Sequence, residues 1–148
     1  NAGFLVNKKF ENISIEELEY SFKVNSFAPF ILTQRLIPFL NEKAHILSIS
    51  SMGGIQGTQK FPGLSAYSTS KSTLITLTEC LAEEYKMSDF YFNCLALGAV
   101  ETEMLKKAFP DYTAPIKSQE MGEFIFDFFI NGFKYFNGQV IPVSLTTP

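Results

Sequence analysis

The chain has no tryptophan, no long apolar run and no cluster of basic residues, and two of these absences exclude whole classes of protein. A membrane-spanning helix needs about 20 consecutive apolar residues, and no stretch of the 148 residues reaches that length. The 12 lysines and arginines are scattered along a chain of net charge −3, whereas a nucleic-acid-binding surface concentrates them in a patch. Neither a membrane nor a nucleic acid is therefore an expected partner.

Metal ligands and disulfide partners are equally scarce. Cys80 and Cys94 are the only cysteines, and their spacing fits neither a metal site nor a Cys-x-x-Cys motif. No group of His, Cys, Asp and Glu residues has the spacing of metal ligands, so no metal is expected. We interpret the cysteines as two buried, reduced thiols, which are typical of a cytoplasmic protein, and keep a disulfide as the alternative.

Phenylalanine is abundant where tryptophan is absent. The chain holds 16 phenylalanines, and 46% of its residues are apolar, which is enough to bury a core in a protein of this length. We therefore expect a single domain over residues 1–148. The stretch from Phe124 to Phe136 is rich in phenylalanine, and we interpret it as core or as a contact with another subunit.

Predicted helices and strands alternate along the chain. Ser14 and Glu17 form a capping-box pattern, which predicts a helix from Ser14 to about Leu40 that Pro29 and Pro38 bend or shorten. Apolar periodicity and turn residues predict strands at residues 44–50, 90–97 and 139–143, helices at 65–85 and 118–133, a glycine-rich loop at 51–64 and an irregular segment at 98–117. This alternation is typical of an α/β fold in which right-handed crossovers join parallel strands.

A tyrosine and a lysine four residues apart carry the strongest indication of chemistry. Tyr67 and Lys71 lie in the first turns of the helix predicted at residues 65–85, and this spacing places both side chains on one helical face. A lysine ammonium near a phenol favours the phenolate and lowers its pKa from about 10. Such a tyrosine could exchange a proton near neutral pH, as carbonyl reduction requires, although an ordinary helix remains the alternative for the pair alone.

Separate segments bring further polar residues to the same place. Ser50 and Ser51 end the first predicted strand, residues 98–102 follow the second, and the tyrosine–lysine pair opens the helix between them. In parallel α/β sheets the functional crevice lies at the carboxyl ends of the strands, so these residues are expected to meet there. His45 begins a strand, at the opposite end of the sheet, and a structural role is expected for it.

An ordered series of segments resembles the short-chain dehydrogenase/reductase family over nearly the whole chain. The series consists of Asn1-Ala2-Gly3, Asn25, the strand that ends at Ser51, Tyr67-Ser68-Thr69-Ser70-Lys71, Asn93 through Thr102 and Asn137 through Val143. The resemblance implies a Rossmann-like doubly wound parallel sheet, of which this chain supplies the last strands and helices. It also implies an oxidoreductase that interconverts a ketone and a secondary alcohol by hydride transfer with NAD or NADP.

The resemblance assigns a role to each residue of the site. Tyr67 would be the general acid in reduction and the general base in oxidation, and Lys71 would lower its pKa and bind the nicotinamide ribose. Ser51, with Ser50 as the alternative, would bind the carbonyl oxygen, and Asn25 would hold a water that links Lys71 to solvent. The residues implied in cofactor binding are Asn1, Ala2, Gly3, Tyr67, Lys71, Gly98, Val100 and Thr102.

Two departures from the family qualify the resemblance. The chain has no Gly-x-x-x-Gly-x-Gly turn. In the family this turn lets backbone amides approach the cofactor pyrophosphate. In addition, Leu97 stands where the family usually has proline. We therefore expect the catalytic part of a longer enzyme, which alone would fold poorly or bind dinucleotide weakly, with an open edge on the strand at residues 44–50. The alternative is a truncated, non-enzymatic interaction module that uses this edge and the phenylalanine-rich helix.

The substrate is not specified beyond a small-molecule carbonyl or alcohol. Tyr67 lies 16 positions after Ser51, which is more than is usual in the family, so the loop between them is expected to be enlarged and to form a wall of the substrate pocket. Residues 103–117, where the family places its substrate lid, include Phe109 and Tyr112. These aromatic residues predict a modest pocket with apolar walls.

Self-association is a further implication of the resemblance. Family members commonly associate through the helices predicted here at residues 14–40 and 65–85. A homodimer or homotetramer is therefore expected.

Overall fold

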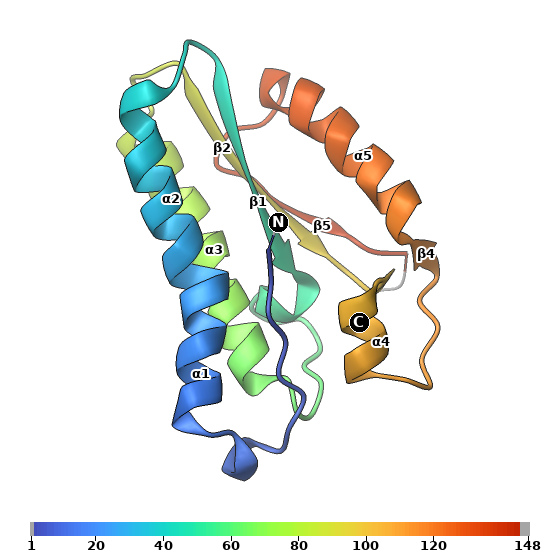
Figure 1. Cartoon of the computed structure of the whole chain (residues 1–148). Helices are drawn as coiled ribbons and strands as arrows, with labels where there is room; N and C mark the ends of the chain where they lie inside the picture. The colour runs from blue at the N-terminus through green and yellow to red at the C-terminus, as the bar shows by residue number, and fades with distance from the viewer. Residues whose placement is uncertain (1, 146–148) are drawn as a thin grey trace.

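A three-stranded parallel sheet lies between two layers of helices in the computed structural model of the chain, which describes residues 2–145 (Figure 1). The strands β1 (Ala44–Ser51), β2 (Phe90–Leu97) and β5 (Val140–Val143) lie in the order β1-β2-β5. The helices α1 (Ile15–Phe22), α2 (Ala28–Leu36) and α3 (Ser65–Glu84) cover one face, and α5 (Ser118–Asn131) covers the other. This arrangement confirms the predicted α/β fold with parallel strands.

The central strand β2 forms the core of the sheet. Its residues 92–96 are buried, because helices cover both faces and a strand lies on each side. β1 pairs with β2 along its whole length. Among residues 2–145, no strand pairs with the other edge of β1, and most of its residues are only half-buried. This edge is therefore open, as the sequence predicted.

The helix predicted from Ser14 to about Leu40 is formed, but it is not regular throughout. Its capping box is confirmed, since Ser14 Oγ accepts the Glu17 N–H at 3.2 Å and the Glu17 carboxylate accepts the Ser14 N–H at 3.0 Å. A π-helical turn, η2 (Lys23–Phe27), separates α1 from α2, and a 3-10 turn, η3 (Ile37–Phe39), ends the helix. Pro29, the second residue of α2, cannot donate the backbone hydrogen bond of a regular helix, so the pairing changes there. Asn25, within the π turn, is buried.

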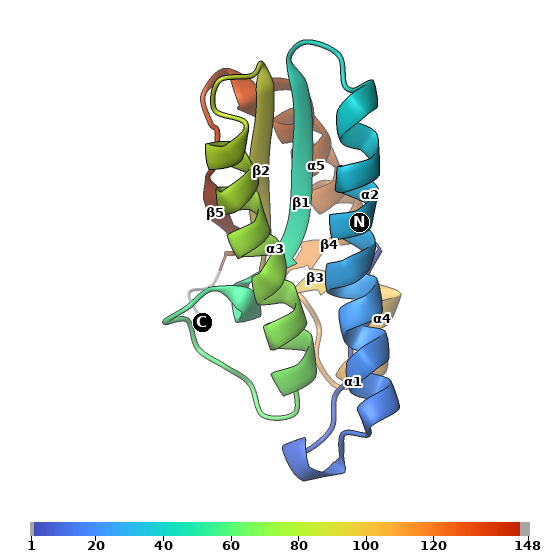
Figure 2. The ribbon, with the colours of Figure 1, turned by 90° about the vertical axis from the view of Figure 1, so that its left-hand side faces the viewer.

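The helix α3 runs along one face of the sheet beside α1 and α2 (Figure 2). It begins at the predicted residue and ends one residue earlier than predicted. Its inward face consists of Ala66, Ser70, Lys71, Leu74 and Thr78. Three of these five buried residues are polar, and one is a lysine, which is rarely buried without a specific partner. The face of α3 that packs on the sheet therefore also carries the polar residues of a candidate functional site.

The segment at residues 98–117, predicted to be irregular, contains three short elements. These are β3 (Val100–Glu101), α4 (Glu103–Ala108) and β4 (Ile116–Lys117). The Thr102 hydroxyl begins α4 by accepting the Leu105 N–H at 3.2 Å, and β3 pairs with β4 as a separate parallel sheet. Elements of two to six residues are too short for apolar periodicity to reveal them.

The two cysteines are free, as predicted, but only one is buried. Cys94 lies in β2 with no exposed surface, and burial raises the pKa of its thiol to about 11. Cys80 is exposed, so the prediction of two buried thiols is wrong for this residue. It lies two positions after the buried Thr78, which places it on the opposite side of α3.

His45 has the structural role expected of it. Its Nε2 lies 3.1 Å from the Asn93 Nδ2, its Nδ1 lies 2.9 Å from the Phe129 carbonyl oxygen, and its ring stacks on that of Phe129. Because the Asn93 amide donates to Nε2, the proton of the ring resides on Nδ1. Burial lowers the pKa of His45, so the ring is a neutral packing element under the start of β1.

Apolar side chains are exposed on the outer faces of α2 and α5. The most exposed of them are Phe30, Ile31, Leu32 and Leu36 on α2 and Phe124, Phe126, Phe129 and Ile130 on α5. Phe126 is 67% exposed, so the interpretation of the phenylalanine-rich stretch as core is wrong for part of it. Within residues 2–145 no helix is long and apolar enough to cross a membrane, and no group of three acidic, histidine or cysteine side chains is placed to hold a metal ion.

Candidate active site

The candidate site lies where the strands of the main sheet end. Ser51 is the last residue of β1, Gly98 follows the last residue of β2, and Tyr67 and Lys71 lie in the first two turns of α3. The N-terminal segment passes the same place, since Gly3 lies near Lys71. The segments that the sequence predicted to converge are thus brought together.

Tyr67 and Lys71 share one face of α3, as their spacing predicted. The Lys71 Nζ lies 6.0 Å from the centroid of the Tyr67 ring, and Lys71 is only 5% exposed. Its Nζ donates a hydrogen bond to the Ile49 carbonyl oxygen in β1 at 2.9 Å. The Ser51 side chain lies close enough to the Tyr67 hydroxyl to favour the phenolate. The three side chains are therefore neighbours, with the lysine bonded to the strand rather than to the phenol.

The pKa values of this group differ from the expectation. Burial raises the pKa of Tyr67, although the nearby Ser51 hydroxyl acts in the opposite direction. Burial also lowers the pKa of Lys71. The prediction that Lys71 lowers the pKa of Tyr67 is therefore wrong for the protein without a ligand. Desolvation disfavours the phenolate and outweighs the attraction of an ammonium that lies 6.0 Å from the ring.

The two serines at the end of β1 have different partners. Ser50 is buried, and its Oγ donates to the Lys71 carbonyl oxygen at 2.8 Å. Ser51 Oγ accepts the Gly53 N–H at 3.2 Å and lies beside the Tyr67 hydroxyl. Ser50 therefore holds α3 against the sheet, whereas Ser51 faces the tyrosine. This geometry favours Ser51 over Ser50 as the residue that would contact a substrate.

Asn25 ties the N-terminal segment to α3. Its Oδ1 accepts the Phe4 N–H at 2.8 Å, and its Nδ2 donates to the Phe4 carbonyl oxygen at 2.8 Å and to Ser70 Oγ at 2.9 Å. Asn25 is 1% exposed, and both N–H groups of its amide are used by these bonds. A water that links Asn25 to Lys71 would therefore have to bond to an oxygen atom of Asn25.

Ser70 is a member of this network that the sequence analysis missed. It is fully buried, donates from Oγ to the Tyr67 carbonyl oxygen at 2.8 Å and lies 3.2 Å from Ser21 Oγ. Together with its bond to Asn25, these contacts connect the N-terminal segment to the helical turn that carries Tyr67. The sequence could have identified Ser70 by its position three residues after Tyr67, which places it near the same face of the helix.

Gly3, one of the residues implied in cofactor binding, lies beside Lys71. A Cβ at this position would lie 3.7 Å from both Lys71 Nζ and Asn25 Oδ1. Glycine therefore leaves open a space beside the lysine in which a ligand could lie. Ala2 is the exposed neighbour of Gly3, and Asn1 lies outside the described residues.

The other implied cofactor residues lie in the segment after β2. The Gly98 N–H donates to the Val143 carbonyl oxygen at 2.9 Å, and a Cβ at Gly98 would lie 2.4 Å from Ser144 Oγ. Glycine is thus required there by the close approach of two chain segments. Val100 is half-buried in β3, and the Thr102 hydroxyl begins α4, so Thr102 already has a structural partner.

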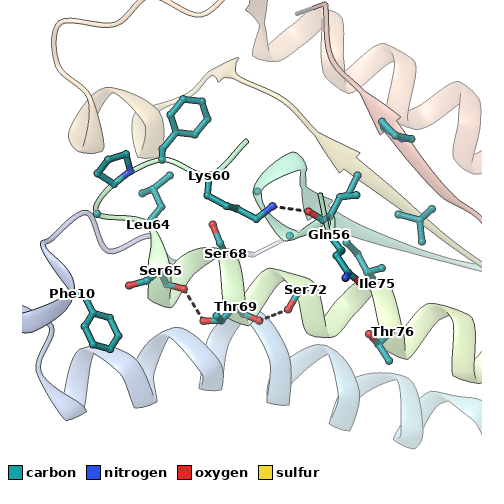
Figure 3. Close-up of a pocket in the computed structure, with 18 of the residues that line it drawn as sticks. Phe10, Gln56, Lys60, Leu64, Ser65, Ser68, Thr69, Ser72, Ile75 and Thr76 are labelled. Atoms are coloured by element: carbon teal, nitrogen blue, oxygen red, sulfur yellow. Dashed lines mark hydrogen bonds between the residues drawn. The ribbon is translucent and has the colours of Figure 1, made fainter. Parts of the chain in front are cut away.

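Two cavities lie near these residues. The larger, of about 1050 Å³, is a groove between α3 and the loop at residues 53–64, into which Figure 3 shows Ser68 and Lys60 projecting. Lys60 Nζ donates to the Ile55 carbonyl oxygen at 2.6 Å, so its charge is held by its own loop. The smaller, of about 470 Å³, lies between residues 3–7 and α4. Gly3 lines the smaller cavity, which therefore reaches the neighbourhood of the Lys71 ammonium.

Known proteins resemble the chain in both sequence and structure. L-2,3-butanediol dehydrogenase from Corynebacterium glutamicum is 36% identical over 107 residues, which are 70% of this chain and 40% of that protein. A 3-oxoacyl-[acyl-carrier-protein] reductase from Aquifex aeolicus is 34% identical over 106 residues, which are 70% of this chain and 42% of that protein. A short chain dehydrogenase from Escherichia coli CFT073, solved with NADPH, is 26% identical with a TM-score of 0.84, over 96% of this chain and 60% of its own. The chain spans less than two thirds of the length of each.

The matched region contains the candidate site. The family of short chain dehydrogenases matches this chain over residues 1–113, a range that includes Asn25, Ser51, Tyr67 and Lys71. The parallel sheet and its two helical layers agree with the solved structure over almost the whole chain. On the strength of both matches, this chain belongs to the short-chain dehydrogenase family.

Proposed function

We propose that this chain is the catalytic part of an NAD- or NADP-dependent oxidoreductase that interconverts a carbonyl and a secondary alcohol. The observation that carries the proposal is the position of Ser51, Tyr67 and Lys71 beside one another, with the serine hydroxyl close enough to the tyrosine to act on its pKa. Two neighbouring hydroxyl groups can bind one carbonyl oxygen together, and one of them can also supply a proton. Members of the family use NAD or NADP, and the relative from E. coli was solved with NADPH.

Gly3 and Lys71 would hold the nicotinamide nucleotide. The space that a Cβ at Gly3 would fill lies next to Lys71 Nζ. An ammonium has three donor hydrogens, of which the Ile49 carbonyl oxygen uses one, so further donors are available for ribose hydroxyls. When bound, the nucleotide supplies a hydride to the carbonyl carbon in reduction and accepts one in oxidation.

The residues of the chain would manage the charge and the proton. In reduction, negative charge builds on the carbonyl oxygen, and the Ser51 hydroxyl donates a hydrogen bond to it. Tyr67 transfers its phenolic proton to the same oxygen, which completes the alcohol. The Lys71 ammonium stabilises the tyrosinate that remains, and oxidation reverses each step. Ser70 and Asn25 would keep the turn that carries Tyr67 in position through their buried hydrogen bonds.

The ionisation of Tyr67 is expected to depend on the bound nucleotide. Without it, burial holds the pKa of Tyr67 above its ordinary value, so the phenol should stay protonated at neutral pH. The cationic ring of an oxidised nicotinamide would favour the phenolate and lower this pKa. The ionisation of Tyr67 is measured as the difference in tyrosinate absorbance between wild type and Tyr67→Phe. Following this difference against pH, with and without NADP⁺, gives the pKa of Tyr67 in the bound and the free protein. A free protein whose Tyr67 ionises near neutral pH would contradict the account.

A panel of carbonyl compounds tests the reaction itself. One relative is named for L-2,3-butanediol and another for a 3-oxoacyl chain on a carrier protein, so we infer a small diketone or a 3-oxoacyl thioester as the substrate class. The full-length protein is mixed with NADH or NADPH and each carbonyl, and loss of the reduced nucleotide is followed by absorbance. Consumption with a member of the panel supports the proposal, whereas failure to bind either nucleotide contradicts it.

A second candidate function is a non-enzymatic interaction module. The open edge of β1 and the exposed phenylalanines of α5 favour it, because such surfaces can pair with another protein. Titration of NADH and NADPH by fluorescence separates the two candidates. An interaction module need not bind a nucleotide, whereas the oxidoreductase must.

We also propose that the protein forms a homodimer or homotetramer through the layer made by α1, α2 and α3. The exposed apolar face of α2, including Leu32 at 59% exposure, supports this contact. Leu32→Arg is expected to shift the full-length protein toward the monomer in light scattering, because the interface would bury an unpaired charge. Gln34→Arg adds the same charge at an exposed polar position of the same helix and should leave the mass unchanged. A monomeric wild type would refute the contact.

A further inference from the structure

A single carboxylate braces the segment that lies over the strand ends. Glu101 forms an ion pair with Lys106 of α4 at 2.8 Å and accepts the Ala114 N–H at 3.2 Å. These bonds join α4 to the chain on both sides of it. Together with the pairing of β3 and β4, they make residues 100–117 one structural unit, the lid unit.

Asn7 bonds the far end of α4. Its Nδ2 donates to the Ala108 carbonyl oxygen at 2.7 Å, and Ala108 is the last residue of the helix. The final carbonyl groups of a helix have no partner within it, so Asn7 supplies one from outside. The two residues are 101 positions apart, and the bond therefore connects the lid unit to the N-terminal segment.

Asn7 is held from its other side by the loop that precedes α3. The Lys8 N–H donates to the Gly63 carbonyl oxygen at 3.1 Å, and a Cβ at Gly63 would lie 2.2 Å from Asn7 Oδ1. Gly63 has a φ of +87°, a conformation that favours glycine. The oxygen of the Asn7 amide thus rests against the loop, while its nitrogen bonds the lid unit.

The smaller cavity lies beside this bond. It is a cleft of about 470 Å³ with the N-terminal segment on one side and α4 on the other. Met104 of α4 lies close to Gly3. A Cβ added at Gly3 would lie 3.3 Å from Met104 Cε and 3.7 Å from Lys71 Nζ. Asn7 is exposed. The cleft therefore has the Lys71 neighbourhood at one part of its wall and the exposed Asn7–Ala108 bond at another.

We propose that Asn7 is a positioning residue that latches the lid unit across this cleft and so retains the carbonyl substrate once it has entered. The inference rests on the proposed function, because it takes the cleft as the route to Lys71. One neutral hydrogen bond in an exposed position shifts an equilibrium by only about 2- to 10-fold, so the latch can open and close during turnover. Among the helices and strands, β3 of its own unit is the main neighbour of α4, so its release would leave the main sheet intact.

Hydrogen–deuterium exchange of the full-length protein tests the latch without any turnover. Asn7→Asp keeps the size of the side chain and the oxygen beside Gly63, but it places an acceptor against the Ala108 carbonyl oxygen. The amides of Lys106 and Phe109, which bond within α4, are expected to exchange about 3- to 10-fold faster, while those of β2 stay unchanged. Equal exchange of α4 in the variant and the wild type would overturn the proposal.

Asn12→Ala is the matched control. Asn12 is exposed, lies five residues further along the same segment, and its side chain makes no hydrogen bond within residues 2–145. Exchange in α4 should be the same in this variant as in the wild type. If Asn12→Ala accelerates α4 as much as Asn7→Asp does, the effect belongs to the segment in general and the latch is refuted.

Steady-state kinetics with a carbonyl that the enzyme reduces separate an effect on KM from an effect on kcat. A general loosening of the structure would not change KM alone. Asn7→Asp should raise the KM for the carbonyl several-fold while kcat changes less, because Tyr67, Lys71 and Ser51 are untouched. A fall in kcat at constant KM would count against the latch. If the wild type reduces no carbonyl, the proposed function fails, and the exchange experiment still decides whether Asn7 holds the lid unit.

Discussion

Replacing Tyr67 with phenylalanine is expected to lower kcat/KM for carbonyl reduction by about 10²- to 10⁴-fold, the usual contribution of a general acid. The substitution removes one hydroxyl group and keeps the ring, which is half-buried next to Lys71. Affinity for the nucleotide should stay close to that of the wild type, because Gly3 and Lys71 remain in place. Nucleotide titration by fluorescence and the reduction assay together separate binding from chemistry.

Tyr85→Phe provides the matched control for this experiment. Tyr85 directly follows the same helix at its other end, where its ring packs against Phe90 and Phe92. The same chemical change far from Ser51 should leave kcat/KM unaltered. A Tyr67→Phe enzyme that retains the wild-type rate would remove Tyr67 from the mechanism, whatever the behaviour of the control.

Asn25→Ala is expected to have the largest effect on stability, with a loss of about 2–4 kcal/mol in the free energy of unfolding. The side chain is 1% exposed and bonds both backbone groups of Phe4 as well as Ser70 Oγ. Truncation leaves these buried groups without partners and opens a space between the N-terminal segment and α3. Urea unfolding of the full-length protein measures the change.

Two further variants identify the cause of this loss. Asn25→Asp keeps the acceptor for the Phe4 N–H but loses both donors, and it places a carboxylate oxygen against the Phe4 carbonyl oxygen. It should therefore be at least as unstable as Asn25→Ala, and more so at high pH, where the carboxylate is charged. Gln34→Ala removes an exposed amide from α2 and should cost little. Equal stability of Asn25→Ala and wild type would show that the network is not what holds the segment.

The order of the elements and the position of the site could be predicted because both depend on local patterns. Apolar runs bounded by turn residues marked the strands, and β1 ends at Ser51, one residue later than predicted. The capping box at Ser14 fixed the start of α1. Parallel strands must present their carboxyl ends together, so the convergence of Ser51, Tyr67 and residues 98–102 followed from topology alone.

The electrostatics of the pair could not be read from its spacing. Four residues of separation place Tyr67 and Lys71 on one face, but they do not say which group the ammonium bonds. In the folded chain Lys71 Nζ bonds the Ile49 carbonyl oxygen, and burial becomes the dominant influence on the pKa of Tyr67. Both facts depend on the neighbouring strand, which the Tyr-x-x-x-Lys pattern does not contain.

Contacts between distant segments were equally inaccessible from the sequence. The bonds from Asn25 to Phe4 and from Asn7 to Ala108 span 21 and 101 positions, and no periodicity relates their partners. The water-holding role of Asn25 stays a prediction, and the structure adds that its amide nitrogen is fully bonded by protein. Cys80 was misjudged for a related reason, since composition predicts that a thiol is buried but not which side of α3 faces the sheet.

Transfer of deuterium from the nucleotide to the product tests the central claim most directly. The full-length protein is incubated with NADPH or NADH that carries deuterium at both C4 positions, together with the carbonyl that it consumes fastest. The account predicts an alcohol with one deuterium on the carbinol carbon in the wild type and almost no product in Tyr67→Phe. An alcohol without deuterium, or equal labelling in the Tyr67→Phe variant, would contradict it.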